Sequence, residues 1–243
     1  MSSSAVTGAR ALLSGNEAIA RGAFEAGVRL AGAYPGTPAT EILEALAQCP
    51  EVHAEWSPNE KVAFEVALGA SLAGARAIAS MKHVGLNVAS DPLITASYVG
   101  VRGGLVVVSA DDPGMFSSQN EQDNRHYARL AKVPMLEPSD SQEAKEFTIA
   151  AFELSERFDT PVLLRITTRI AHSKSVVALG ERAEHEPTGF VREPAKTVMV
   201  PGNARGRHRL VEVRTVQLAR WAETCDLNRV EMADHRIGVI CSG

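Results

Sequence analysis

The sequence predicts an α/β fold with a three-layer arrangement, in which helices cover both faces of a parallel sheet. Between Ser14 and about Thr168, helical stretches rich in small residues alternate with short β-branched runs, as in strand–helix–strand crossover units. The run PVLLRIT at 161–167 is apolar over most of its length, as expected for a strand covered on both faces. A length of 243 residues with 45% hydrophobic content is sufficient for one large domain and an appendage.

The first third of the chain contains two strand–helix steps followed by a third strand. Asn16 is a suitable helix cap, and Pro58-Asn59 is typical of the residues that precede a helix. Pro and Gly in YPGTP, at 34–38, indicate a turn. The predicted elements are helices at 16–27, 39–48 and 60–73, and strands at 28–33, 52–56 and 76–81.

The following stretch continues the same alternation. The apolar run at 104–110 is the most strand-like in the chain, and 141–157 has the pattern of an amphipathic helix. Further elements are a helix at 91–99, a strand end at 135–138 and a strand at 161–167. The polar segment 111–123, which follows the strand predicted at 104–110, is too long for a simple turn, and loops of this length in compact domains are often functional.

The remaining sequence predicts a domain division. We expect residues 1–175 to form the first domain and residues 176–234 a connector with one helix, at 210–225. Residues 235–243 resemble the first strand of a following, truncated domain. The basic cluster Arg205, Arg207, His208 and Arg209 could contact phosphate, but such short runs are more often part of a solvated linker, and we favour the linker.

Composition excludes several function classes. The net charge is −4, which gives no indication of a nucleic-acid partner or an acidic membrane surface. No run of about 18 apolar residues is present, and we expect a cytoplasmic protein without membrane contact. Cys49, Cys225 and Cys241 are widely spaced without a Cys-x-x-Cys pair, so we expect buried structural thiols and no metal site.

Three segments resemble the alpha subunit of the indolepyruvate ferredoxin oxidoreductase family. They are AGAYPGTPATEI at 31–42, EWSPNEKVAFEVALGASLAGAR at 55–76 and SADDPGMFSSQNEQDNR at 109–125. The similarity continues at 132–147, through the connector and into RIGVICSG at the end, so it covers almost the whole chain. Each motif alone is weak, but three in order at suitable intervals are hard to obtain by chance.

This resemblance implies that the first domain is the pyrimidine-binding half of a thiamine diphosphate site. Glu60 matches the family's glutamate, whose carboxyl supplies a proton to the pyrimidine ring nitrogen N1′ of the cofactor. An acidic residue after Pro58-Asn59 also suits the helix dipole, so Glu60 could be structural, and Glu55 and Glu65 are weaker candidates. No Gly-Asp-Gly segment followed by Asn occurs, so magnesium, the diphosphate site and the iron–sulfur clusters are expected outside this chain.

Three further groups of residues are candidates for cofactor or substrate contact. Pro35, Gly36 and Thr37 follow a strand end, where open parallel sheets bind ligands, although Thr37 could instead cap the next helix. Lys82 and His83 also lie at a strand end and could meet a 2-oxoacid carboxylate, although a lone histidine is more often structural. Ser117, Ser118 and Asn120 could line a polar pocket. Phe116 stands where the family resemblance leads us to expect histidine, so substrate range could differ.

The implied activity is oxidative decarboxylation of indole-3-pyruvate with coenzyme A, with electrons passing to ferredoxin. Asp111-Asp112 replaces the arginine-containing pattern of the pyruvate-using relatives and favours an aryl substrate. The implied partners are the remaining domains of the alpha subunit and a second subunit, and we also expect a homo-oligomer. Alternatives are a pyruvate or 2-oxoglutarate enzyme, or a non-catalytic assembly module. The isolated chain is expected to be inactive.

Overall fold

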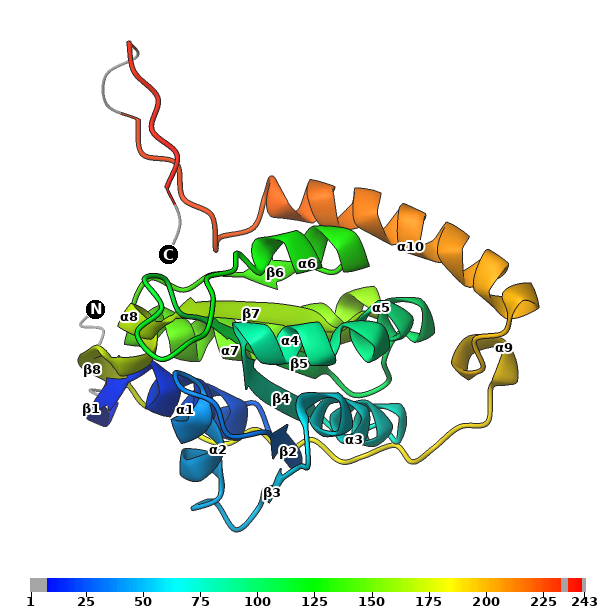
Figure 1. Cartoon of the computed structure of the whole chain (residues 1–243), viewed down its shortest axis with the longest axis horizontal. Coiled ribbons are helices and arrows are strands. Elements are labelled where there is room, and N and C mark those ends of the chain that lie inside the picture. Colours follow the sequence, from blue (N-terminus) through cyan, green and yellow to red (C-terminus); the bar gives the residue numbers. More distant parts are fainter. Residues whose placement is uncertain (1–7, 233–235, 242–243) are drawn as a thin grey trace, which may run out of the picture.

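The computed structural model describes residues 8–232 and 236–241, and it confirms the α/β class (Figure 1). Six parallel strands within the described residues form one sheet in the order β3-β2-β4-β5-β7-β6. The central strand β5 (Leu105–Asp111) is buried along its whole length. The other strands are β2 (Leu30–Ala33), β3 (His53–Trp56), β4 (Ala77–Lys82), β6 (Met135–Leu136) and β7 (Val162–Thr167).

Helices cover both faces of the sheet, because successive side chains of a strand point to opposite faces. On β4, Ile78 joins one core cluster whereas Ala77 and Ala79 join the other. The first face is covered by α1 (Gly15–Glu25), α2 (Thr40–Leu46), α7 (Ser141–Phe158) and α8 (Thr168–His172). The second face is covered by α3 (Glu60–Leu72), α4 (His83–Val88), α5 (Ser90–Val99) and α6 (Arg125–Ala131).

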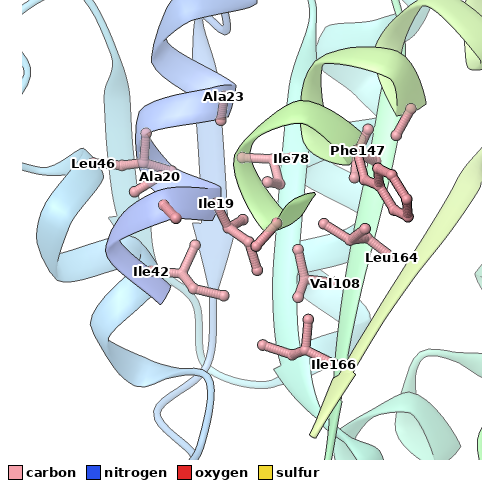
Figure 2. Packing of buried hydrophobic residues seen from close by; sticks show 14 of the residues in the cluster. Ile19, Ala20, Ala23, Ile42, Leu46, Ile78, Val108, Phe147, Leu164 and Ile166 are labelled. Carbon is pink, nitrogen blue, oxygen red and sulfur yellow. The ribbon is translucent and has the colours of Figure 1, made fainter. Parts of the chain in front are cut away.

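The core of the first face joins α1 and α2 to the centre of the sheet. Figure 2 shows Ile19 of α1 between Ile42 of α2 and the strand residues Val108 and Ile166. Ile19 and Ile42 are fully buried. Burial of one such side chain contributes about 1.5–3 kcal/mol, so this cluster fixes both helices against the sheet.

Local signals set the ends of the two helices that pack against each other on this face. Ser14 caps α1, accepting from the Glu17 amide at 3.2 Å, while the Glu17 carboxylate accepts from the Ser14 amide at 2.7 Å. Asp140 caps α7 by accepting from the Glu143 amide at 2.8 Å. A buried ion pair between Glu25 and Lys145, at 3.0 Å, joins the two helices.

The structure contains short elements that the sequence did not predict. β1 (Arg10–Ser14) and β8 (Lys174–Ala178) form a two-stranded antiparallel sheet at the edge of the domain. Their pairing joins segments far apart in the chain, and neither has a long apolar run. The helices α4, α6 and α8, of five to seven residues, were also missed.

The connector is docked on the domain, which corrects the interpretation of a solvated linker for Arg207 and His208, whereas Arg205 and Arg209 are exposed as that interpretation predicts. It contains α9 (Pro194–Thr197) and α10 (Pro201–Ala222), so the predicted helix begins well before Leu210. Arg207 pairs with Asp159 at 2.9 Å, and the His208 ring stacks on Tyr98 with centroids 5.8 Å apart. In Figure 1, α10 runs along one side of the domain.

The remaining predictions for the C-terminal part have mixed outcomes. Residues 236–241 contain no strand, and the rest of the predicted strand, at 235 and 242–243, lies outside the described residues, so the domain division stays a prediction. Cys49 and Cys225 are half-buried, but Cys241 is exposed, which corrects the expectation of buried thiols. No helix in the described part of the chain is long and apolar enough to cross a membrane.

Candidate functional site

The topology of the sheet points to the end of β2 as the candidate ligand site. The chain leaves β2 toward α2 on one face of the sheet, whereas both neighbouring strands, β3 and β4, lead to helices on the opposite face. Connections that diverge in this way leave a crevice beyond the carboxyl ends of the strands. Two surface hollows, of about 440 and 510 Å³, lie elsewhere, beside α1 and between α6 and α10.

Glu60 is the first residue of α3 and lies at this edge. Asn59 caps the helix, its side-chain oxygen accepting from the Val62 amide at 3.0 Å, so the helix begins where the sequence predicted. A Cβ placed on Gly85 of α4 would lie 2.6 Å from both Cγ and Oε1 of Glu60. The half-buried Glu60 side chain therefore lies directly on the α4 backbone, and its carboxyl has no hydrogen-bond or ion-pair partner in the described part of the chain.

The turn after β2 contributes Pro35, Gly36 and Thr37. The Gly36 amide donates to the Thr40 hydroxyl at 3.0 Å, and a Cβ on Gly36 would lie 3.1 Å from Cδ of Lys82. Thr37 does not cap α2, because the cap position belongs to Ala39. The exposed Thr37 hydroxyl has no partner among the described residues, which leaves it available to a ligand.

Lys82 and His83 follow β4, and both bind backbone carbonyls of the loop at 112–124. The Lys82 ammonium donates to the Ser117 carbonyl at 3.0 Å. His83 is fully buried, and its Nε2 donates to the Asn120 carbonyl at 3.0 Å. The two residues anchor the loop in this structure, and their contact with a substrate stays a prediction.

Asp112 organises the start of the loop at 112–124. Its carboxylate accepts from the Ser117 amide at 2.8 Å, from the Ser118 hydroxyl at 2.7 Å and from the Thr168 hydroxyl at 2.8 Å. Burial raises the pKa of Asp112, but these hydrogen bonds outweigh it and lower the pKa to about 2. The predicted ligand contacts Ser117 and Ser118 are thus engaged by Asp112, while the Asn120 side chain accepts from Gln122 at 2.8 Å.

A buried ionic network below the loop was missed by the sequence analysis. Arg165 of β7 donates to Asp111 at 2.8 Å and also pairs with Glu137. Asp111 accepts from the Asn124 amide at 3.1 Å, and burial raises its pKa against the attraction of Arg165. An arginine within the apolar run PVLLRIT was the available signal, because such a charge requires a buried partner.

The described residues contain no group of three or more side chains that could hold a metal ion. The candidate site consists of the Glu60 carboxyl and the Thr37 hydroxyl beside β2, both without a partner in the part of the chain that the structure describes, and is bordered by an anchored polar loop. A doubly wound parallel sheet with such groups at its carboxyl edge defines a ligand-binding α/β domain.

Comparison with known proteins gives the family. The family model described as "Pyruvate flavodoxin/ferredoxin oxidoreductase, thiamine diP-bdg" matches residues 21–216. The chain therefore belongs to this family of thiamine diphosphate-binding oxidoreductase domains.

Among curated relatives, indolepyruvate oxidoreductase subunit IorA of Methanothermobacter marburgensis is 52% identical over 97% of this chain and 39% of its own length. The subunit of the same name from Archaeoglobus fulgidus is 48% identical over the same shares. 2-Oxoglutarate synthase subunit KorA of Methanocaldococcus jannaschii is more distant, 29% identical over 71% of this chain and 50% of its own. The chain thus spans about 39% of the length of its indolepyruvate oxidoreductase relatives.

A solved structure supports the fold. The 2-oxoglutarate:ferredoxin oxidoreductase from Magnetococcus marinus, with 2-oxoglutarate, coenzyme A and succinyl-CoA bound, superposes with a TM-score of 0.69. The match covers 87% of this chain and 45% of that one at 19% identity. At this identity the similarity concerns the fold alone.

Proposed function

We propose that this chain forms the pyrimidine-binding wall of the thiamine diphosphate site in an indolepyruvate ferredoxin oxidoreductase. The enzyme would convert an aryl 2-oxoacid to its acyl-coenzyme A ester and pass the electrons to ferredoxin. The observation that carries this proposal is Glu60, whose half-buried carboxyl is held at the carboxyl edge of the sheet without a partner in the described residues. The names of the more similar relatives favour indolepyruvate over 2-oxoglutarate.

The residues present fit the pyrimidine end of the cofactor. An aminopyrimidine ring offers nitrogens that exchange hydrogen bonds with a carboxyl, and none of the described residues occupies the hydrogen-bonding groups of the Glu60 carboxyl. The Thr37 hydroxyl, which can both donate and accept, lies on the neighbouring turn. Glycine at position 36 leaves room for the Lys82 side chain, and glycine at position 85 leaves room for the Glu60 side chain, so the absence of a Cβ at both places lets these two side chains lie at this edge.

When bound, thiamine diphosphate supplies the electron sink for cleavage beside the 2-oxo group. Glu60 would hold the pyrimidine end of the cofactor by sharing a proton with ring nitrogen N1′. Asn59 fixes the first turn of α3, and the α4 backbone at Gly85 restricts the direction of the Glu60 side chain. The turn at 35–37 is proposed to contact cofactor or substrate, with Lys82, His83, Ser117, Ser118 and Asn120 as proposed substrate contacts.

Other parts of the enzyme are proposed to lie outside this chain. Magnesium with the diphosphate site, the iron–sulfur clusters and the electron-transferring partner subunit belong to the remaining domains and subunits. Ferredoxin and coenzyme A as partners, a homo-oligomeric assembly and a cytoplasmic location also stay predictions. Turnover is expected only in the complete enzyme, and a 243-residue chain alone should be inactive.

The decisive experiment compares Glu60→Gln with Glu65→Gln in the complete enzyme. Glu65 lies on the same helix with about half of its side chain exposed, 3.9 Å from Lys61, so its substitution is a matched control. Thiamine diphosphate affinity is measured by calorimetry, and acceptor reduction is measured with indole-3-pyruvate, pyruvate and 2-oxoglutarate. We expect indole-3-pyruvate to be preferred and Glu60→Gln to lose about 10²–10⁴-fold in turnover, the usual range for one acid–base group.

Each alternative has a distinct result. Preference for pyruvate or 2-oxoglutarate, with the Glu60→Gln variant still inactive, would retain the cofactor role and change the substrate. Unchanged cofactor affinity and turnover in Glu60→Gln would remove Glu60 from the site and favour a non-catalytic assembly module.

A further inference from the structure

The loop at 112–124 carries two large apolar side chains that the domain leaves uncovered. Phe116 is 82% exposed, and its neighbour Met115 is 50% exposed. Single exposed apolar residues are common on protein surfaces. This pair differs because the surrounding backbone is fixed at several points.

The residues on both sides of the pair are tied down. The Ser117 amide donates to Asp112 at 2.8 Å, and the Ser117 hydroxyl donates to the Thr37 carbonyl at 3.3 Å. On the other side, the Gly114 amide donates to the Glu121 carboxylate at 2.9 Å. The tip therefore presents its apolar side chains from an ordered backbone.

Met115 itself has a backbone conformation that side-chain-bearing residues seldom adopt. Its φ is 56°, in the left-handed region, which costs about 1–2 kcal/mol for residues other than glycine. Its amide donates to the Asp112 carbonyl at 3.0 Å, which holds the conformation. Backbone conformations of this kind are concentrated at active sites and ligand-binding segments.

The tip lies beside the proposed cofactor edge. Ser117 contacts both Thr37 of the turn after β2 and Lys82 at the end of β4. Lys82 is in turn adjacent to Gly36, and the helix that follows it carries Gly85, on which Glu60 lies. A continuous set of contacts thus connects the loop tip with the carboxyl proposed to act on the cofactor.

We propose that Phe116, with Met115 beside it, binds the aryl side chain of the 2-oxoacid and determines preference for aryl over small 2-oxoacids. This assignment rests on the function proposed above. An uncharged aromatic ring on an ordered loop loses little conformational freedom on binding, which favours affinity. Contact between two aromatic rings adds to the burial of apolar area, and a thioether next to a ring is also favourable.

The test uses the complete enzyme and three variants. Phe116→Ala removes the ring, Phe116→Trp retains an aromatic ring, and Phe190→Ala removes a ring that is 63% exposed in the connector. For each variant, kcat/KM is measured with indole-3-pyruvate and with pyruvate, and equilibrium dialysis gives the Kd of indole-3-pyruvate. Because kcat/KM is compared between the two substrates for the same preparation, a general loss of folded enzyme does not change the ratio.

We expect Phe116→Ala to lower the ratio of kcat/KM for indole-3-pyruvate over pyruvate by about 10-fold, the size of one aromatic contact. Phe116→Trp and Phe190→Ala should keep the ratio of the wild type. An unchanged ratio in Phe116→Ala would overturn the proposal, as would an equal loss with both substrates, which indicates packing against another domain. Wild-type enzyme without turnover of indole-3-pyruvate would overturn the proposed function itself and this assignment with it.

Discussion

Replacing Gly85 with alanine would push a methyl group into the side chain of Glu60. The new Cβ would lie 2.6 Å from Cγ and Oε1 of Glu60 and 2.8 Å from its Cδ. Carbon atoms in ordinary contact are about 3.5–4.0 Å apart, so the Glu60 side chain has to move by about 1 Å. It is free to do so, because no hydrogen bond or ion pair in the described residues restrains its carboxyl.

The substitution should change the stability little but lower the activity strongly. Alanine is favoured over glycine in a helix by about 0.5–1 kcal/mol, which offsets the cost of moving one half-buried side chain. The free energy of unfolding should therefore change by less than about 1 kcal/mol. A displacement of about 1 Å in a catalytic group costs on the order of 10²-fold in rate, so turnover by the complete enzyme should fall by about that factor.

The assay combines urea unfolding with acceptor reduction at saturating thiamine diphosphate. Gly69→Ala is the matched control, since Gly69 lies on the same helix as Glu60 and a Cβ there meets no atom within 4 Å. The control should gain about 0.5–1 kcal/mol and retain full activity. Full activity in Gly85→Ala, with the methyl group seen beside a displaced Glu60 in a crystal structure, would refute the role of Glu60.

Two further predictions concern the loop and the connector. The pKa of Asp112 is lowered from 3.8 to about 2, so the ionised carboxylate stabilises the fold above pH about 4, and this stabilisation is lost as the pH falls toward 2. The free energy of unfolding of the wild type should therefore decline across this pH range. Asp112→Asn should lack that part of the decline. Arg214 donates to the carbonyls of Ser97 at 2.6 Å and Asp159 at 2.8 Å, so Arg214→Ala should cost about 1.5–3 kcal/mol. The same variant should speed amide hydrogen exchange in α10, whereas the exposed Arg209→Ala should not; equal exchange in the two variants would contradict the docking role.

The parts of the fold that sequence predicted correctly depend on local signals. The helix expected from Glu60 begins there, because Pro58-Asn59 combines a helix-start residue with a side chain that accepts from the third following amide. The strand expected at 104–110 corresponds to β5 with a shift of one residue, because an apolar run of that length needs a fully buried position. Each signal lies within a few residues of the element that it predicts.

The parts that were missed depend on partners distant in sequence. Arg165 is buried because Asp111 pairs with it across two adjacent strands, 54 residues apart. β1 is a strand because β8 pairs with it, and the two are joined only through the whole domain. Arg207 was read as solvated because nothing near it in sequence shows that Asp159 would be its partner.

For the candidate site residues, too, positions at strand ends were predicted correctly from local signals, and contacts with residues distant in sequence were not. Thr37 was a reasonable helix cap from sequence, but α2 begins later than expected, at Thr40, and Ala39 takes the cap position. His83 was expected at an open edge, and instead it is covered because the loop at 112–124 folds over it and offers the Asn120 carbonyl. The sequence identifies the residue types at strand ends, and only the path of the loop decides which of them a ligand can reach.

Topology and two glycines together explain why Glu60 is placed as it is. After β2 the chain passes to a helix on one face of the sheet, whereas after both neighbouring strands it passes to helices on the opposite face. The connections therefore diverge at the carboxyl end of β2. α3 approaches β2 closely at Gly32, where a Cβ would lie 3.0 Å from the Ala63 carbonyl oxygen. Gly85 then lets the Glu60 side chain lie on α4. A side chain at either glycine would move the carboxyl relative to this strand end, so the position of the proposed proton donor depends on residues that carry no chemistry of their own.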